Sequence, residues 1–136
     1  MPSPKRKIGD TCETLVRKRL KVMNFTVLES NYLRKWGEID IIALEPFSRE
    51  TRRLHFIEVK GSVSRENDVS DFSREIMPEA NVHSFKIRRL WRAIQTWLAE
   101  NPKYADFEWQ IDVAAVFLNI PEKKAKIRWT RNILLE

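Results

Sequence analysis

Two apolar segments in the first half of the chain carry acidic residues where a buried strand normally has none. They are residues 37–44 (GEIDIIAL) and 54–60 (LHFIEVK). Their isoleucine- and valine-rich composition predicts buried β-strands. A charge inside such a strand is costly unless it is paired or binds a metal. The two segments therefore predict a central sheet whose strands carry a functional site.

The spacing of the charged residues predicts that they meet. Side chains two positions apart on a strand share a face, so Glu58 and Lys60 point one way, and Ile57 and Val59 point the other. If the two strands are neighbours, Asp40 and Glu58 face each other across roughly 5 Å. Carboxylates that close repel each other unless one is protonated or a cation lies between them.

A hard divalent cation fits this pair of carboxylates. Mg²⁺ takes oxygen ligands, often one or two carboxylates, and keeps several waters. Lys60 then stands beside the metal as a positive charge or as a proton-transfer group. Two carboxylates and a lysine around Mg²⁺ form an arrangement that can cleave phosphodiester bonds.

Two alternatives remain open for these residues. Glu38 shares a face with Asp40 and can be the ligand in its place. The charges can also be ordinary ion pairs at the edge of the sheet. In that case Glu58 pairs with Lys60, and Asp40 pairs with Arg34 or Lys35.

Composition narrows the class of protein. We expect a single domain over residues 1–136, with a basic tip at residues 1–7. A formal charge of +6 favours a polyanionic partner such as nucleic acid. Cys12 is the only cysteine, which excludes an internal disulfide and a cysteine-based zinc site and fits the cytoplasm. No apolar run approaches the length of a membrane span or signal peptide, so we expect no membrane association.

Periodicity predicts the remaining elements. A helix over residues 4–23 carries Glu13 at the edge of its apolar stripe, with Arg17 one turn later as an ion-pair partner, and Asn24 ends it. Strands are predicted at 25–30, 38–44, 54–60, 109–118 and 125–130, the first three as an antiparallel meander. Residues 31–36 form a turn or begin the next strand. Residues 61–80 are predicted to be a mobile loop.

A second helix is predicted over residues 81–100. Its core stripe comprises Ile87, Leu90, Trp91, Ile94 and Leu98, with Trp97 on the flank. Arg88, Arg89 and Arg92 gather on the opposite side, where they either face solvent or contact phosphate. Because this helix precedes the strand at 109–118, that strand is predicted to lie parallel to a neighbour in the middle of the sheet.

Three segments together resemble a known family. Residues 37–43 (GEIDIIA), 56–60 (FIEVK) and 111–114 (IDVA), in this order and spacing, resemble the YraN-like family of predicted endonucleases. That family is placed in the restriction-endonuclease-like PD-(D/E)xK superfamily, with archaeal Holliday-junction resolvases as relatives. The match extends to both helices and covers most of residues 5–118, through Gly9, Asp10, Glu13, Lys86, Arg88, Arg89 and Leu90.

The resemblance implies a fold and a site. The fold is an α/β restriction-endonuclease-like αβββαβ core, a mixed sheet flanked by helices. Asp40 and Glu58, with the carbonyl of Val59, would bind Mg²⁺ or Mn²⁺, and Lys60 would assist the attacking water. Glu13 would complete the site from the first helix, with Asp10 as an alternative in that role.

The implied activity is hydrolysis of DNA, with branched or damaged DNA as candidate substrates. The candidate nucleic-acid contacts are Arg34, Lys35, Lys86, Arg88, Arg89 and Arg92. A homodimer is a further expectation, since relatives that cut two strands commonly pair. The alternative is a non-catalytic nucleic-acid-binding or repair-accessory module that retains the fold.

Some features depart from the family pattern or allow two interpretations. Gln110 stands near where relatives often have arginine, residues 45–53 lengthen one connection, and the segment after Lys60 lacks the glycines common in relatives. We interpret Asp112 as a structural acceptor rather than a ligand. His55 alternates away from Glu58 and is not expected to be catalytic. Trp36 either stacks on a base or forms a wall of the core.

Overall fold

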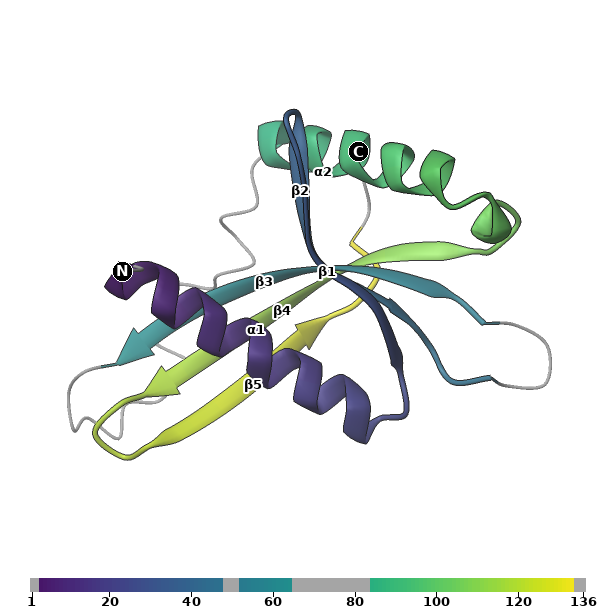
Figure 1. Ribbon diagram of the computed structural model, residues 1–136. Helices are drawn as coiled ribbons and strands as arrows, with labels where there is room; N and C mark the ends of the chain where they lie inside the picture. The colour runs from purple at the N-terminus through teal and green to yellow at the C-terminus, as the bar shows by residue number, and fades with distance from the viewer. Residues whose placement is uncertain (1–2, 48–51, 65–83, 134–136) are drawn as a thin grey trace.

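A computed structural model describes residues 3–47, 52–64 and 84–133, with only the backbone at 84–87. The chain forms an αβββαβ core followed by one more strand, which confirms the predicted fold class (Figure 1). The elements are α1 (Pro4–Val22), β1 (Thr26–Arg34), β2 (Gly37–Leu44), β3 (Leu54–Ser64), α2 (Ser84–Glu100), the 3-10 helix η3 (Pro102–Tyr104), β4 (Trp109–Asn119) and β5 (Lys124–Thr130).

The five strands form one mixed sheet in the order β1-β2-β3-β4-β5. β1, β2 and β3 are consecutive antiparallel neighbours, as the predicted meander requires. β4 lies parallel to β3, and β5 returns antiparallel along β4. The parallel pairing needs a crossover between β3 and β4, and α2 lies within that connection.

The two helices cover opposite faces of the sheet (Figure 1). On the α1 side, Cys12, Val16 and Leu20 pack against apolar residues of β2, β3 and β4. On the α2 side, the core includes Phe56 of β3 and Ile111 of β4, together with buried residues of the helix. A sheet buried on both faces explains why its central strands read as nearly continuous apolar runs.

α1 begins and ends at conventional capping signals. Ser3 accepts a hydrogen bond from the Arg6 amide, and Pro4 occupies the start of the helix. Asn24, with φ of 64°, adopts the left-handed conformation that ends the helix where predicted. Residues 4–7 of the expected basic tip therefore form the first turn of α1.

Among the described residues, no helix is long and apolar enough to cross a membrane.

The buried tryptophan of α2 differs from the prediction. Trp97 is 2% exposed and stacks on Tyr104, whereas Trp91, assigned to the core stripe, is 43% exposed. The indole N–H of Trp97 also donates to Glu29 of β1 at 2.6 Å. The β1–β2 hairpin packs on this side of the helix, so the buried stripe turns toward Ala93 and Trp97.

Two strands run further than predicted. β1 continues to Arg34 and pairs with Gly37 across a turn at Lys35 and Trp36. β3 continues to Ser64 because its pairing with β4 extends to the end of both strands. Residues 61–64 of the expected mobile loop are therefore strand, and residues 65–80 lie outside the described part of the chain, as do residues 48–51 of the insert.

Candidate functional site

Asp40 lies where β2 and β3 separate. The paired residues of these strands run from Leu44 with Leu54 to Ile41 with Ile57. Beyond that point, Asp40 Oδ2 accepts a hydrogen bond from the Val59 backbone N–H at 2.8 Å. The carboxylate thus takes a backbone donor at the fork between the strands.

A twist of β2 accompanies this placement. Residues two apart on a regular strand face the same side of a sheet. Ile39 nevertheless packs in the core under α2, while Ile41 packs in the core under α1. The strand therefore turns sharply at Asp40. Strict alternation along residues 38–44 does not predict this turn.

Glu58 and Lys60 lie on the other side of the fork. Glu58 is 5% exposed, and its Oε1 lies 3.3 Å from Lys60 Nζ. Burial and the charge of Glu58 raise the pKa of Asp40 to about 8, although the Val59 N–H opposes the shift. The two carboxylates therefore repel each other, as their spacing predicted.

Two further carboxylates act on Asp40. Glu13 of α1 and Glu38 of β2 both raise its pKa. Burial raises the pKa of Glu13 itself, while a hydrogen bond with Asn31 and the charge of Arg17 lower it. Glu13 is thus within electrostatic reach of the predicted site. The exposed Asp10 acts on Glu13.

The contact between Glu13 and Asn31 was missed from the sequence. Asn31 has φ of 54°, a left-handed conformation within β1. Asparagine tolerates that conformation better than most residues. An asparagine between two strand-forming runs was the available signal, and its side chain helps to hold the helix carboxylate.

The donor set fits a hard cation that keeps part of its water shell. Among the described residues, no three His, Cys, Asp or Glu side chains come close enough to hold a metal by themselves. Asp40 and Glu58 offer two buried or half-buried carboxylates, which matches Mg²⁺ or Mn²⁺ better than a metal that needs an all-protein cage. The role of the Val59 carbonyl as a ligand stays a prediction.

Most of the expected nucleic-acid contacts lie on α2 and the hairpin tip. Arg88, Arg89, Arg92 and Lys35 are exposed. Arg34 instead binds Glu100 through two hydrogen bonds of 3.0 Å and lies over the Tyr32 ring, so it does not form the alternative pair with Asp40. The side chain of Lys86 lies outside the described residues.

Asp112 has a different environment from Asp40. It is fully buried and accepts hydrogen bonds from His55, Gln110, Trp129 and the Asn132 amide. Burial alone would raise the pKa of Asp112, but these four donors lower it below its usual value. This matches the interpretation of Asp112 as a structural acceptor.

His55 joins that network to the end of β2. Its Nδ1 lies 2.7 Å from Asp112, and its Nε2 lies 2.9 Å from Glu45. Gln110 accepts a hydrogen bond from Arg53 and donates one to Asp112. The Arg53 guanidinium, from the residue just before β3, therefore lies beside Gln110.

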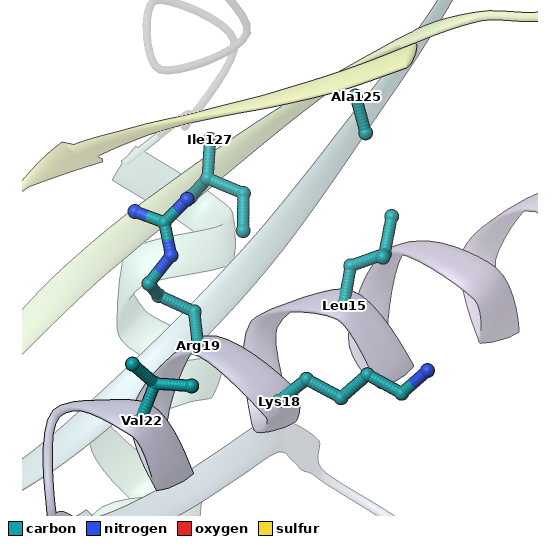
Figure 2. A pocket seen from close by; sticks show the side chains of 6 residues that line it. All are labelled: Leu15, Lys18, Arg19, Val22, Ala125 and Ile127. Atoms are coloured by element: carbon teal, nitrogen blue, oxygen red, sulfur yellow. The ribbon is translucent and has the colours of Figure 1, made fainter. Parts of the chain in front are cut away.

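A groove of about 230 Å³ lies elsewhere, between α1 and β5. Leu15, Val22 and Ile127 are among its lining residues, and Arg19 reaches across it toward Ile127 (Figure 2). Arg19 falls within the apolar stripe of α1 but is exposed, because its stem packs while its charge reaches solvent. The lining contains none of the candidate catalytic residues.

Comparison with known proteins identifies the family of this chain. The sequence model of the uncharacterised protein family UPF0102 matches residues 12–116. A UPF0102 protein of Vibrio parahaemolyticus is 30% identical over 132 residues, 97% of this chain and 95% of the relative. One of Geotalea daltonii is 37% identical over 109 residues, 80% and 75% of the two chains. The matched span contains Asp40, Glu58 and Lys60, and the chain belongs to the uncharacterised protein family UPF0102, the YraN family.

Proposed function

We propose that this protein is a metal-dependent endonuclease that hydrolyses phosphodiester bonds in DNA. The observation that carries the proposal is the pair of carboxylates at the fork between β2 and β3. Asp40 is held by the Val59 amide, and Glu58 lies close enough to raise its pKa. Two such carboxylates beside a lysine suit the binding of a divalent cation and the cleavage of a phosphodiester.

Each residue has a role in this proposal. Asp40 and Glu58 would hold Mg²⁺ or Mn²⁺. When bound, the cation supplies positive charge against the phosphate oxygens and makes water a better nucleophile. Lys60, now paired with Glu58 at 3.3 Å, would orient the attacking water or stabilise the phosphate charge. Glu13 would add negative charge from α1 and strengthen cation binding.

The position of α2 supports a nucleic acid as the substrate. β2 touches α2 at Arg89, where a side chain on Gly37 would collide with the helix backbone. β1 reaches the other end of the helix, at Trp97 and Glu100. The arginine-rich half of α2 therefore lies on the side of β2, the strand that carries Asp40. Phosphate contacts there would position DNA without reading its sequence.

Cleavage assays test the proposal. The protein is incubated with linear duplex, single-stranded and four-way-junction DNA, in Mg²⁺, Mn²⁺ or EDTA. We expect metal-dependent nicking that falls at least about a hundredfold in Asp40→Asn, Glu58→Gln and Lys60→Ala. Glu122→Gln, a carboxylate in the turn before β5, serves as the matched control and should cut normally.

Two results would contradict the proposal. Cleavage that survives in Asp40→Asn and Glu58→Gln would place the activity elsewhere. Salt-sensitive DNA binding without nicking in any metal would instead support a non-catalytic binding module.

A further inference from the structure

Trp36 lies at the tip of the β1–β2 hairpin and is held in place while its ring stays partly open. It is 36% exposed, and its indole N–H donates to Thr96 Oγ1 at 3.0 Å. Arg89 donates to its backbone carbonyl at 3.4 Å, and the Arg92 guanidinium lies 5.8 Å from the ring centre. These contacts orient an indole that remains accessible to a ligand.

The packing of the hairpin does not by itself explain this indole. The hairpin already meets α2 through the Gly37 backbone and through hydrogen bonds from Tyr32 to Glu100 and from Trp97 to Glu29. An exposed indole adds less to that packing than the buried rings do, because its face stays in contact with water. The exposed part of the ring is therefore available to contact a ligand.

The surroundings of Trp36 have the chemistry of a single-strand binding site. Lys35 precedes Trp36 in the chain, and Arg89 and Arg92 contact it from α2; all three basic side chains are exposed. Proteins that bind single-stranded nucleic acid combine basic residues, which follow the phosphates, with aromatic rings on which bases stack. An arginine beside an indole also keeps the charge close to the stacked base.

Trp36 lies within reach of DNA held at the candidate site. It precedes Asp40 by four residues, at most roughly 13 Å of extended backbone. That is well under the roughly 34 Å of one duplex turn. A nucleic acid strand that runs along β2 from a phosphate at Asp40 and Glu58 would have bases near the hairpin tip.

We infer that Trp36 is a stacking platform for an unpaired nucleobase close to the cut, so the preferred substrate is DNA that is single-stranded near the scissile phosphate. In an intact duplex the base faces are covered by their neighbours, and exposing one costs unstacking energy. The inference relies on the proposed function for the position of the cut, but base binding is measured without cleavage.

The test compares hairpin variants in EDTA. Fluorescence anisotropy measures the binding of a labelled oligothymidine strand and of a labelled fully paired duplex. Trp36→Leu should weaken binding of the single strand about tenfold and change duplex binding little. Trp36→Phe, which keeps an aromatic face, should restore most of the affinity. Trp91→Leu, which changes an exposed tryptophan on α2, is the matched control and should bind normally.

Stability and cleavage separate the outcomes. Urea unfolding should show similar midpoints for Trp36→Leu and Trp36→Phe, so that a folding defect is not mistaken for lost stacking. Equal binding of the single strand by wild type and Trp36→Leu, or no binding at all, would overturn the inference. Binding that depends on Trp36 without metal-dependent nicking would leave the inference standing and refute the nuclease.

Discussion

Asp40 and Asp112 are both aspartates set in apolar strands of one sheet, yet their environments have opposite effects. Asp112 accepts four hydrogen bonds, and its pKa is lowered despite complete burial. Asp40 accepts one from Val59 and faces Glu58, and its pKa is raised to about 8. A carboxylate with enough donors stabilises a fold, whereas one that faces another carboxylate is available to bind a cation.

The difference follows from what neighbours each strand. β4 lies between β3 and β5, so donors from both sides and from the segment after β5 reach Asp112. Asp40 lies at the fork where β2 leaves β3, and it accepts a hydrogen bond from the Val59 amide of β3. Where the two strands separate, the repulsion between the Asp40 and Glu58 carboxylates is not offset by a set of donors like that around Asp112. The following variants test this contrast.

Asp112→Ala should have the largest effect on stability. It leaves His55, Gln110, Trp129 and the Asn132 amide without their shared acceptor. We expect a loss of about 3–5 kcal/mol in the free energy of unfolding, the range for breaking a buried charged pair. Urea unfolding at pH 7 measures it, with Asp10→Ala as the exposed control, expected within about 0.5 kcal/mol of wild type. A loss below about 1 kcal/mol would show that Asp112 is not a structural centre.

His55→Gln should cost about 2 kcal/mol, and the cost should depend on pH. Burial lowers the pKa of His55, but Asp112 and Glu45 raise it more, so the net shift is upward from 6.5. A raised pKa means that the charged imidazole contributes fully below about pH 6.5 and that its contribution fades as the pH rises through the folded value. The difference in the free energy of unfolding between wild type and variant should therefore shrink as the pH rises from 5.5 to 9. If the difference in the free energy of unfolding did not change with pH, His55 would be neutral in the folded protein.

Asp40→Asn should change stability in the opposite direction. Asparagine keeps an oxygen for the Val59 amide and removes the repulsion from Glu58. We expect a gain of about 1 kcal/mol in EDTA at pH 8. Added Mn²⁺ should raise the melting temperature of wild type and leave the variant unchanged, since only wild type retains both carboxylates. A variant less stable than wild type in EDTA would mean that the charged form of Asp40 is already compensated by its neighbours.

The sequence predicted those parts of the fold that depend on local pattern. Apolar composition identified the strands, and the expected pairing of the second strand with the third places Asp40 close to Glu58. The choice of core tryptophan was wrong because Trp91 and Trp97 flank the same stripe, and the position of the hairpin decides between them. β3 was predicted too short because its polar end is held by pairing with β4, a tertiary effect that composition does not reveal.

Three features of the candidate site and its surroundings could not be predicted from local sequence pattern. The donors of Asp112 come from β3, β4, β5 and the segment that follows, and no local pattern joins them. The twist that sends Ile39 and Ile41 into different cores breaks the alternation on which the prediction relied. The approach of α1 that brings Glu13 near Asp40 depended on the family resemblance rather than on periodicity.

Glu13→Gln should have the smallest effect on stability and on Mn²⁺ affinity. It tests whether α1 contributes a carboxylate to the candidate site. Glu13 is half-buried and its amide replacement can keep the hydrogen bond with Asn31, so stability should change by less than about 0.5 kcal/mol. Titration calorimetry with Mn²⁺ should show affinity weakened by less than about tenfold, because the charge acts on Asp40 through space. Asp10→Asn, one turn earlier on α1, is the control for the same helix. If Asp10→Asn weakens Mn²⁺ binding more than Glu13→Gln does, the supporting carboxylate is Asp10, and α1 contributes to the site from its exposed edge.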